Sequence, residues 1–178
     1  MSSIRDRALD AAVTLVGTDG VRALTHARVD AAASLPAGST SNHFRTRASL
    51  ISGVIAWIAQ GERRDAGIPE IHSAADLIAA LTQMILAQSG PLAVRTRARY
   101  ALFLEADAAT ARPLRDQRLG METWVRSILR ELGGAPAAAQ SAFLMAAADG
   151  LLLHRLTVDP DAPVASVIDR AVASALTP

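Results

Sequence analysis

The sequence contains no cysteine and no lysine, and it is poor in aromatic residues. Without cysteine, the protein can form neither a disulfide framework nor a thiolate metal site. Aromatic residues make up only 3% of the chain while hydrophobic residues make up 51%, so the core must consist mainly of Ala, Leu, Val and Ile. Because Ala and Leu are strong helix formers, and because Gly and Pro are few, this composition favours an all-α fold.

The sequence also lacks a long uninterrupted apolar segment. Charged residues between positions 5 and 10 break up any apolar core of a signal peptide. The longest apolar run, residues 142–153, contains Asp149 and is shorter than the roughly 20 residues that a membrane-spanning helix needs. We therefore expect a cytoplasmic protein with no membrane partner.

Neither sign of charge dominates the chain. The formal net charge is +1, and all 18 basic residues are arginine. In the first 50 residues six arginines accompany four aspartates, which gives this segment a charge of +2. So mild an imbalance neither indicates nor excludes nucleic-acid binding, and any basic face must arise from the fold.

Capping residues and apolar spacing predict about nine helices and no strand. Two Ser-x-x-Asp segments, at residues 3–6 and 73–76, have the spacing of a capping box, and Thr25 can cap a short helix. Proline favours the first turn of a helix, so Pro91 and Pro136 are expected at helix starts. The expected helices span residues 4 to about 17, 26–33, 37–44, 47–63, 74–89, 91–109, 113–132, 137–156 and 163–176.

Residues 37–44 read AGSTSNHF and place five mediocre or poor helix formers, Gly38 to Asn42, in succession. Small polar stretches of this kind are most often loops. However, a short helix precedes the stretch and an apolar helical segment follows it, so residues 25–44 fit a helix-turn-helix. In that motif the second helix enters the DNA major groove with its N-terminal residues at the base edges.

Short side chains in this stretch suit the major groove, which is about 12 Å wide. Gly38 permits close approach of the backbone, and the Asn42 amide can bond an adenine edge. Arg45 and Arg47 follow at positions where phosphates would pass. Arg28 is compatible either with a phosphate contact or with a solvated charge.

With these features, residues 5–50 resemble the N-terminal domain of the tetracycline-repressor (TetR) family of bacterial transcriptional regulators. The family pattern has an apolar first helix, a glycine, a threonine cap, an Ile-Ala pair, a Gly-Val-Ser turn, a Tyr-x-His-Phe segment, and then Lys and Leu. The matching places here are Ala12, Gly20, Thr25, Val29-Asp30, Ser34-Leu35-Pro36, Ser41-Asn42-His43-Phe44, Arg47 and Leu50. The rest of the chain resembles the family in length and helix order.

Four of these places depart from the family pattern. Asp30 replaces a small residue, and Ser34 replaces the usual turn glycine. Ser41 stands for the usual tyrosine, and Arg47 stands for the usual lysine, which preserves the charge but changes its geometry. These departures bear on base reading more than on the fold.

The resemblance implies an N-terminal three-helix DNA-binding domain, residues 1–46, on a larger helical effector-binding and dimerisation domain, residues 47–178. It implies a transcriptional regulator, by family habit a ligand-responsive repressor, that binds a palindromic operator in double-stranded DNA. Some residues would lie near phosphates and others would face the groove. The residues expected at the DNA are Thr25, Arg28, Ala37, Gly38, Ser39, Thr40, Ser41, Asn42, His43, Arg45 and Arg47.

The helix expected over residues 137–156 is apolar on all sides and must therefore be covered on all sides. Either it is the central helix of a monomer, or one face packs on a second copy. The resemblance favours a homodimer, which would place two recognition helices on half-sites about 34 Å, or a multiple of that, apart. Asp149 requires a partner, either an arginine across the interface or a group in a pocket. The expected interface residues are Phe143, Leu151, His154, Val164, Ile168 and Val172.

The resemblance further implies a cavity among the middle helices that binds an unknown small-molecule effector and thereby lowers DNA affinity. Residues at helical spacing in this region are more often ordinary core than pocket lining. The candidates are Trp57, Met84, Arg99, Tyr100, Phe103, Met121 and Trp124. No cofactor is expected.

Two other classes of function compete with a regulator. An enzyme is disfavoured because the four histidines show no metal-ligand spacing, no Glu-x-x-His pair exists, and no glycine-rich phosphate loop follows a strand. A helical small-molecule-binding or interaction protein that has lost operator reading is compatible with the substitutions at Ser34 and Ser41.

Overall fold

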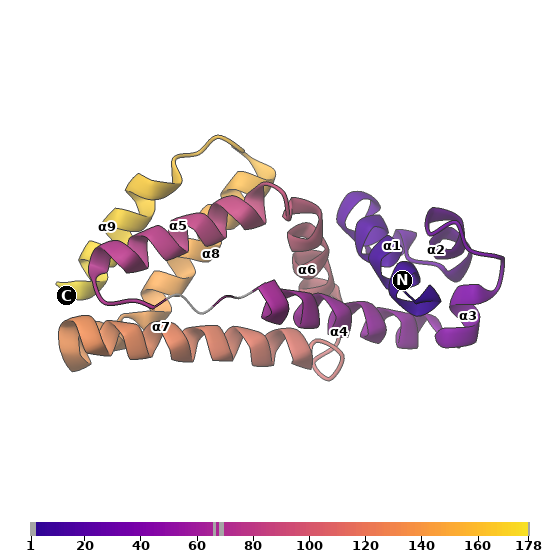
Figure 1. Ribbon diagram of the computed structural model, residues 1–178, viewed down its shortest axis with the longest axis horizontal. Coiled ribbons are helices and arrows are strands. Elements are labelled where there is room, and N and C mark those ends of the chain that lie inside the picture. Colours follow the sequence, from indigo (N-terminus) through magenta and orange to yellow (C-terminus); the bar gives the residue numbers. More distant parts are fainter. Residues whose placement is uncertain (1–2, 66, 68–69, 178) are drawn as a thin grey trace. The chain divides into compact units, whose positions relative to one another are not determined.

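The computed structural model describes residues 3–65, 67 and 70–177 (Figure 1). Within these ranges the chain forms nine α-helices, one short 3₁₀ turn and no β-strand, which confirms the all-α prediction. The elements are α1 (Ile4–Asp19), η1 (Val21–Ala23), α2 (His26–Ala32), α3 (Ser39–His43), α4 (Arg47–Asp65), α5 (Ala74–Ser89), α6 (Ala93–Glu105), α7 (Arg112–Ala139), α8 (Ser141–Thr157) and α9 (Val164–Leu176).

Three helix starts follow the predicted caps. Ser3 and Asp6 form a complete capping box at α1. The hydroxyl of Thr25 accepts the Arg28 amide at α2, and the hydroxyl of Ser73 accepts the amide of the third residue after it at α5. These bonds satisfy amides that have no partner within the first turn of a helix.

One predicted helix start is wrong, and one predicted helix is divided. α6 begins at Ala93 rather than at Pro91, because a turn that bonds the Leu92 amide to a carbonyl of α5 occupies the residues between. The backbone breaks at Gly134, with φ 74° and ψ −163°, as the glycine pair predicts. Two helical segments meet at this kink, so Pro136 lies in the first turn of the segment that follows it, as predicted. That segment ends at Ala139 and α8 begins at Ser141, so the helix expected over residues 137–156 is divided.

Packing divides the chain into two compact units. We call Met1–Ala66 with Ala93–Gln117 the head unit, and Gly67–Leu92 with Arg118–Pro178 the C-terminal unit. α6 therefore packs with the N-terminal helices although it lies far from them in sequence. The expected division into a DNA-binding domain, residues 1–46, and an effector-binding and dimerisation domain, residues 47–178, is a division by function. The packing units do not test it, so it stays a prediction.

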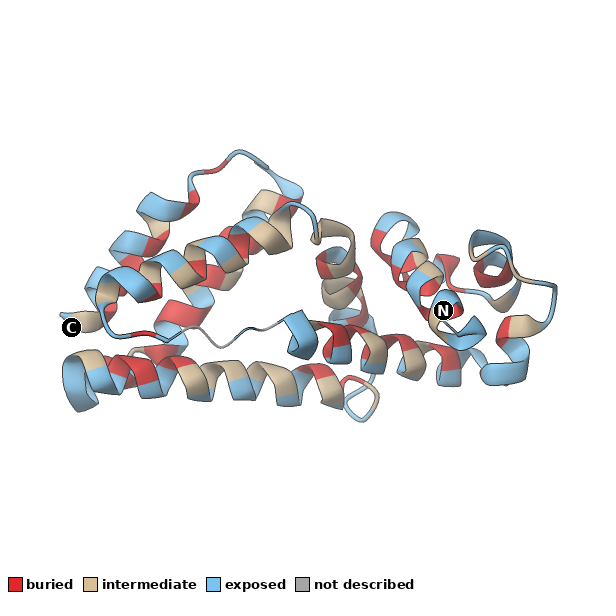
Figure 2. Ribbon diagram, in the orientation of Figure 1, coloured by how far each residue is buried: buried red, intermediate tan, exposed pale blue. Residues whose placement is uncertain are grey.

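α1, α4 and α6 share the core of the head unit, where Leu9, Leu50 and Leu102 are fully buried. In Figure 2 the buried positions recur along these helices at helical spacing. Each fully buried leucine stabilises the fold by about 1.5–3 kcal/mol. α1 and α6 approach so closely at Gly17 that a side-chain methyl there would collide with the Val94 carbonyl.

In the C-terminal unit, α5, α8 and α9 pack on one another. Leu81 and Ile85 of α5 and Leu144 of α8 are buried, as is the apolar stripe of α9. Four residues expected at a dimer interface belong to this core. Leu151, Val164, Ile168 and Val172 are at most 8% exposed, so they face the protomer's own helices and the expectation for them is corrected.

Asp149 finds a partner within its own chain. Arg118 of α7 donates to the Asp149 carboxylate and also to the carbonyl oxygen of Met145, at 3.4 Å. Neither of the two partners considered from the sequence is therefore required to compensate this charge.

Candidate nucleic-acid interface

The turn after α2 is a Schellman motif, in which the chain leaves the helix through a left-handed residue. The Leu35 amide bonds the Asp30 carbonyl at 2.8 Å, and the Ser34 amide bonds the Ala31 carbonyl at 3.1 Å. Ser34 has φ 51°, a left-handed conformation that glycine adopts without steric penalty. The structure thus explains why a glycine is usual here and shows that serine is held in the same conformation.

Arg7 of α1 stabilises this turn from outside. Its guanidinium donates to the Ala33 carbonyl at 2.8 Å and to the Ser34 carbonyl at 3.2 Å. The last carbonyls of a helix have no intrahelical partner, so a cation at this end is favourable. Sequence reasoning missed this role, because 26 residues separate Arg7 from the turn.

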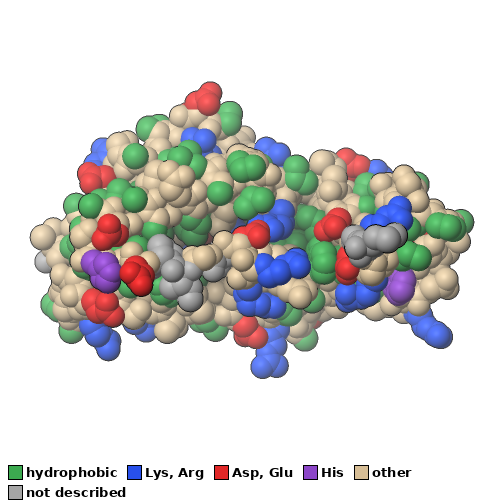
Figure 3. Space-filling view, viewed as in Figure 1, with side chains coloured by type: hydrophobic (Ala, Val, Ile, Leu, Met, Phe, Trp, Pro, Cys, Tyr) green, Lys and Arg blue, Asp and Glu red, His purple; other side chains and the backbone are tan. Residues whose placement is uncertain are grey.

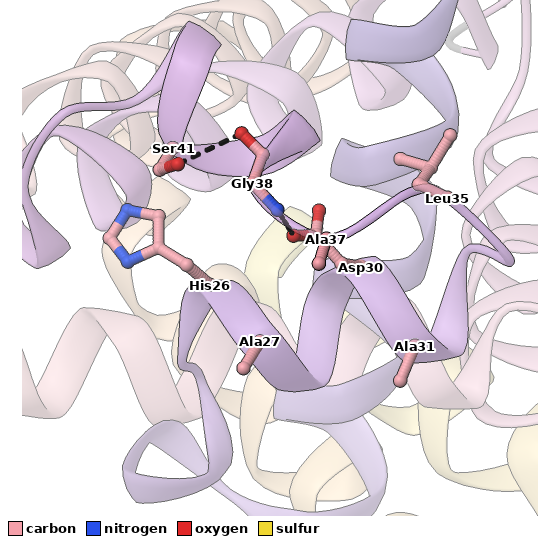
Figure 4. Close-up of a pocket in the computed structure, with 8 residues that line it drawn as sticks. All are labelled: His26, Ala27, Asp30, Ala31, Leu35, Ala37, Gly38 and Ser41. Atoms are coloured by element: carbon pink, nitrogen blue, oxygen red, sulfur yellow. Dashed lines mark hydrogen bonds between the residues drawn. The ribbon is translucent and has the colours of Figure 1, made fainter.

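The start of α3 is fixed by Asp30 of α2, another residue whose role the sequence did not reveal. Asp30 Oδ2 accepts the Gly38 amide at 2.8 Å, and Oδ1 accepts the Thr40 amide at 2.8 Å and the Thr40 hydroxyl at 2.5 Å. Figure 4 shows the side chain reaching from α2 toward Gly38. Gly38 itself has φ 88°, which favours glycine at this position.

The carboxylate of Asp30 is only 4% exposed. Burial alone raises the pKa of Asp30, but the hydrogen bonds from Thr40 and Gly38, together with nearby His26, hold this pKa below its ordinary value of 3.8. Asp30 is therefore ionised at neutral pH, and its three hydrogen bonds are charge-assisted.

The end of α3 is held by His26 and Phe44. His26 Nε2 donates to the Phe44 carbonyl at 2.6 Å, which links the first residue of α2 to the residue after α3. The Phe44 ring is buried against Gly53 of α4, and the Arg5 guanidinium lies 5.5 Å from its centre. Both ends of α3 are thus fixed by residues outside it.

The structure corrects the expectation for Thr40. Thr40 is fully buried and bonds Asp30, so it does not face a DNA groove. Ser39 is partly exposed, and its hydroxyl donates to the Pro36 carbonyl at 2.6 Å. The exposed Ser41 hydroxyl donates to the Gly38 carbonyl at 2.8 Å. These two hydroxyls already donate their protons to backbone carbonyls, so toward a ligand they can act only as hydrogen-bond acceptors.

The remaining residues expected on α3 and its flanks are exposed: Ala37, Gly38, Asn42, His43 and Arg45. In the described part of the chain, no recorded hydrogen bond or ion pair engages the side chains of Asn42, His43 or Arg45. These three polar groups are therefore available to a ligand.

Arg28, Thr25 and Arg47 lie at the surface but have partners. Arg28 donates to Asp19 at 2.5 Å, with about half of its side chain exposed. Arg47 donates to the Val21 carbonyl at 2.8 Å, and the Thr25 hydroxyl caps α2. A phosphate contact from Arg28 would therefore compete with an existing ion pair.

α2 and α3 border a hollow of about 410 Å³ (Figure 4). His26 is the only basic residue that lines it, so the hollow does not form a phosphate site by itself. On the face shown in Figure 3, basic and acidic side chains are interspersed without a continuous basic patch. The hollow is lined by His26, Ala27, Asp30, Ala31, Leu35, Ala37, Gly38 and Ser41.

The candidate effector residues are distributed over both units. In the head unit, Trp57 packs against the core, donates its indole N–H to Asp10 at 2.7 Å and lies beneath Arg64. Arg99 pairs with Glu62 at 3.2 Å, and its guanidinium lies 5.0 Å from the centre of the Tyr100 ring.

The other candidates differ in exposure. Phe103 is 36% exposed in the head unit. Met84, Met121 and Trp124 are partly buried in the C-terminal unit. A pocket formed by all of the candidates stays a prediction.

Among the residues that the structure describes, no group of three His, Asp or Glu side chains could hold a metal ion. Within the same ranges, no single helix has both the length and the apolar composition to cross a membrane, although two pairs of successive helices pass when each pair is taken together.

Residues 72–178 match a family model described as the tetracyclin repressor-like C-terminal domain. The chain is similar to the structure of a TetR family member from Streptomyces coelicolor A3, with 26% identity, 98% of each chain covered and a TM-score of 0.72. It is also similar to the multidrug binding protein EbrR in complex with ethidium, with 27% identity, 97% of this chain and 98% of EbrR covered, and a TM-score of 0.66.

A transcriptional regulator from Rhodococcus sp. Rha1 shares the fold at 17% identity, with 97% and 96% of the two chains covered and a TM-score of 0.79. A comparison with curated proteins gives no match. The family model covers more than half of the chain, and the similar structures extend over nearly all of it. The protein therefore belongs to the tetracycline-repressor-like family of transcriptional regulators.

Proposed function

We propose that this protein binds a palindromic operator in double-stranded DNA as a homodimer and acts as a ligand-responsive repressor. The proposal rests mainly on the conformation and exposure of α3 and the residues after it. Hydrogen bonds with neighbouring residues fix both ends of this helix. The side chains of Asn42, His43 and Arg45 are exposed, and no hydrogen bond or ion pair in the described structure engages them. Such a segment can enter a major groove without reorganising. The proposal includes a cytoplasmic location and no catalytic activity.

Selection from a pool of random 30-base-pair duplexes tests DNA reading. The full-length protein should enrich a palindrome whose half-sites lie one helical turn, or a multiple of it, apart. Enrichment of no sequence at low salt would contradict operator reading. It would favour the alternative of a helical small-molecule-binding or interaction protein.

Arg45 provides a test of contacts to the DNA backbone, because no hydrogen bond or ion pair among the described residues engages its side chain. Arg45→Ala should weaken binding to all duplexes similarly and reduce the slope of log K against log salt by about 1. Arg130→Ala, an exposed arginine of α7, is the matched control and should leave the slope unchanged. Arg47→Ala should also reduce the slope, but it additionally removes the bond to Val21.

For the homodimer, we propose an interface along the exposed face of α8. Phe143 and Leu153 are each 47% exposed there, and His154 is exposed on the same helix. Gly150 lies between them with open space where a side chain would be, so a second helix could approach closely. Leu153→Glu should convert the dimer to a monomer in sedimentation experiments. Leu104→Glu, at a residue that is 84% exposed on α6, should not.

We further propose that a small aromatic molecule is the effector. The support is the similarity to EbrR, which has been solved with ethidium, proflavin and malachite green. The candidate residues Trp57, Tyr100, Phe103 and Trp124 offer aromatic surfaces. An effector lowers DNA affinity only by binding the DNA-incompetent arrangement more tightly, with a usual coupling of about 1–3 kcal/mol. Titrations of the protein with operator, with and without saturating malachite green and corrected for the dye's own binding to the duplex, should show this coupling. Equal operator affinities in both would contradict it.

A further inference from the structure

We propose that Asp30 is a positioning residue for DNA reading, because its carboxylate caps α3 from α2 and fixes how α3 is presented. This inference rests on the proposed DNA-binding function, since positioning has a purpose only if α3 reads a duplex. Asp30 would not touch DNA itself, because it is almost completely buried.

α3 lacks the means to hold itself. It has five residues, its N-cap residue Gly38 has no side chain, and no hydrogen bond from a side chain within the segment caps its first turn. Ser39, Ser41 and Asn42 are modest helix formers, and an isolated helix of this length is unstable in water. The conformation therefore has to be imposed by neighbours.

The Asp30 carboxylate supplies what the segment lacks. An N-cap side chain normally accepts the amide of the second or third helical residue. Here Asp30 Oδ1 accepts the amide of Thr40, the second residue of α3, while Oδ2 accepts the amide of Gly38, the N-cap residue. One buried anion thus satisfies two amides at the N-terminal end of α3. The partial positive charge at this end of a helix also favours a negative charge nearby.

The bond to the Thr40 hydroxyl adds a rotational constraint. Thr40 is turned inward onto Asp30, at 2.5 Å, and is fully buried. Successive residues of a helix are about 100° apart, so Asn42 lies about 200° from Thr40, on the opposite side. The bond between Asp30 and Thr40 thereby determines that Asn42 faces outward. A rotated α3 would present a different set of side chains to the bases.

The first experiment measures the cap without DNA, by amide hydrogen exchange on the full-length protein. Asp30→Asn keeps the shape but replaces one accepting oxygen with a donor. The Gly38 and Thr40 amides should exchange at least about tenfold faster, because bonds to charged groups are among the stronger ones. Amides in the middle of α1 should change little. Asp6→Asn, which removes the same charge from the α1 capping box, is the control and should leave Gly38 and Thr40 unchanged.

The second experiment separates positioning from general stability. The probes are the operator recovered by selection and a random-sequence duplex of equal length. Asp30→Asn should weaken operator binding at least about tenfold while random-duplex binding at low salt changes less than about twofold, because phosphate contacts carry the latter. A structural defect alone would lower both affinities together.

Thr40 supplies a pair of variants that retain the carboxylate. Thr40→Val removes the hydroxyl bond and should lose part of the operator affinity, whereas Thr40→Ser keeps the hydroxyl and should restore it. If Asp30→Asn does not fold, Thr40→Val carries the same test.

Unchanged exchange at Gly38 and Thr40, or equal loss on both duplexes, would overturn the positioning role. If the wild-type protein enriches no operator, the proposed DNA-binding function fails. The exchange experiment would then still decide whether Asp30 caps α3.

Discussion

Helix α3 and helix α8 differ in what holds each of them in place. α3 has five residues and buries only Thr40. It depends on hydrogen bonds that the Asp30 carboxylate accepts at its start and on one that His26 donates to the residue after its end. α8 has 17 residues and buries seven of them, mainly leucines, against its own unit. The first is therefore positioned by a few directional bonds, and the second by apolar area.

The difference bears on how each helix can change. Apolar packing is non-directional and tolerates many sequences of suitable volume. Directional bonds to a buried carboxylate permit few substitutions at the bonded atoms but leave the outward side chains of α3 free to vary. A helix that reads a ligand benefits from the second arrangement, because its exposed residues need not stabilise it.

The largest loss of stability is expected from a substitution at a buried position of α8, which is held in place by apolar packing. Leu144→Ala should lower the free energy of unfolding by about 2–5 kcal/mol, because it removes a fully buried side chain and leaves a cavity. Urea denaturation at fixed protein concentration measures this change. Leu104→Ala, at a residue that is 84% exposed, should change it by less than about 0.5 kcal/mol. Equal effects from both variants would contradict the view that burial holds α8.

A smaller but pH-dependent effect is expected at α3. Asp30→Asn should lower the free energy of unfolding by about 1–3 kcal/mol at pH 7. The pKa of Asp30 is lowered in the folded state, so its contribution is fully present above about pH 5 and is lost as the pH falls through the folded pKa. The difference from wild type should therefore shrink on acidification.

Urea denaturation at a series of pH values from 7 to below the ordinary aspartate pKa measures this dependence. Asp6→Asn serves as the reference, because asparagine can still accept the Ser3 amide in the α1 cap. A stability difference at Asp30 that stays constant with pH would contradict a role for the ionised carboxylate.

Substitutions on the outward face of α3 should change DNA affinity and leave the free energy of unfolding unchanged. Asn42→Ala should lower operator affinity by about 1–3 kcal/mol if the amide reads an adenine. Because the side chain has no partner in the described structure, the urea midpoint should not move. Competition among operators with single base changes would show relaxed preference at one position. Equal weakening on every duplex would remove Asn42 from base reading.

The smallest effect is expected to be stabilising. Ser34 adopts φ 51° in the turn after α2, so Ser34→Gly should raise the free energy of unfolding by up to about 1 kcal/mol. Ser127→Gly, in the interior of α7, should act in the opposite direction because glycine weakens a helix. A Ser34→Gly variant less stable than wild type would contradict the strain argument.

Local signals in the sequence predicted much of the fold. Ser3, Thr25 and Ser73 cap the helices that their spacing indicates, and Gly134 breaks the backbone where a glycine pair stands. Such features depend on neighbouring residues alone. The position of the helix-turn-helix followed from the same kind of signal, supported by the family resemblance.

What the sequence did not reveal depends on rotation and on distant contacts. The run from Gly38 to Asn42 reads as uniformly polar, yet Thr40 turns inward because Asp30, ten residues earlier, offers a buried acceptor. The apolar stripe of α9 predicted that one face of this helix is buried, but not which surface covers that face. Ile168 was expected at a dimer interface and is instead buried within the protomer. Apolar periodicity identifies which face of a helix is buried, but it does not identify the element that packs against that face.

The buried carboxylate of Asp30 has a practical consequence for engineering. A library that seeks new target sequences should randomise Ala37, Ser41, Asn42 and His43 and should leave Asp30 and its bonded neighbours unchanged. Variants chosen in this way would keep the scaffold of the reading segment while its chemistry is replaced, so altered preference could be screened without sacrificing folded yield.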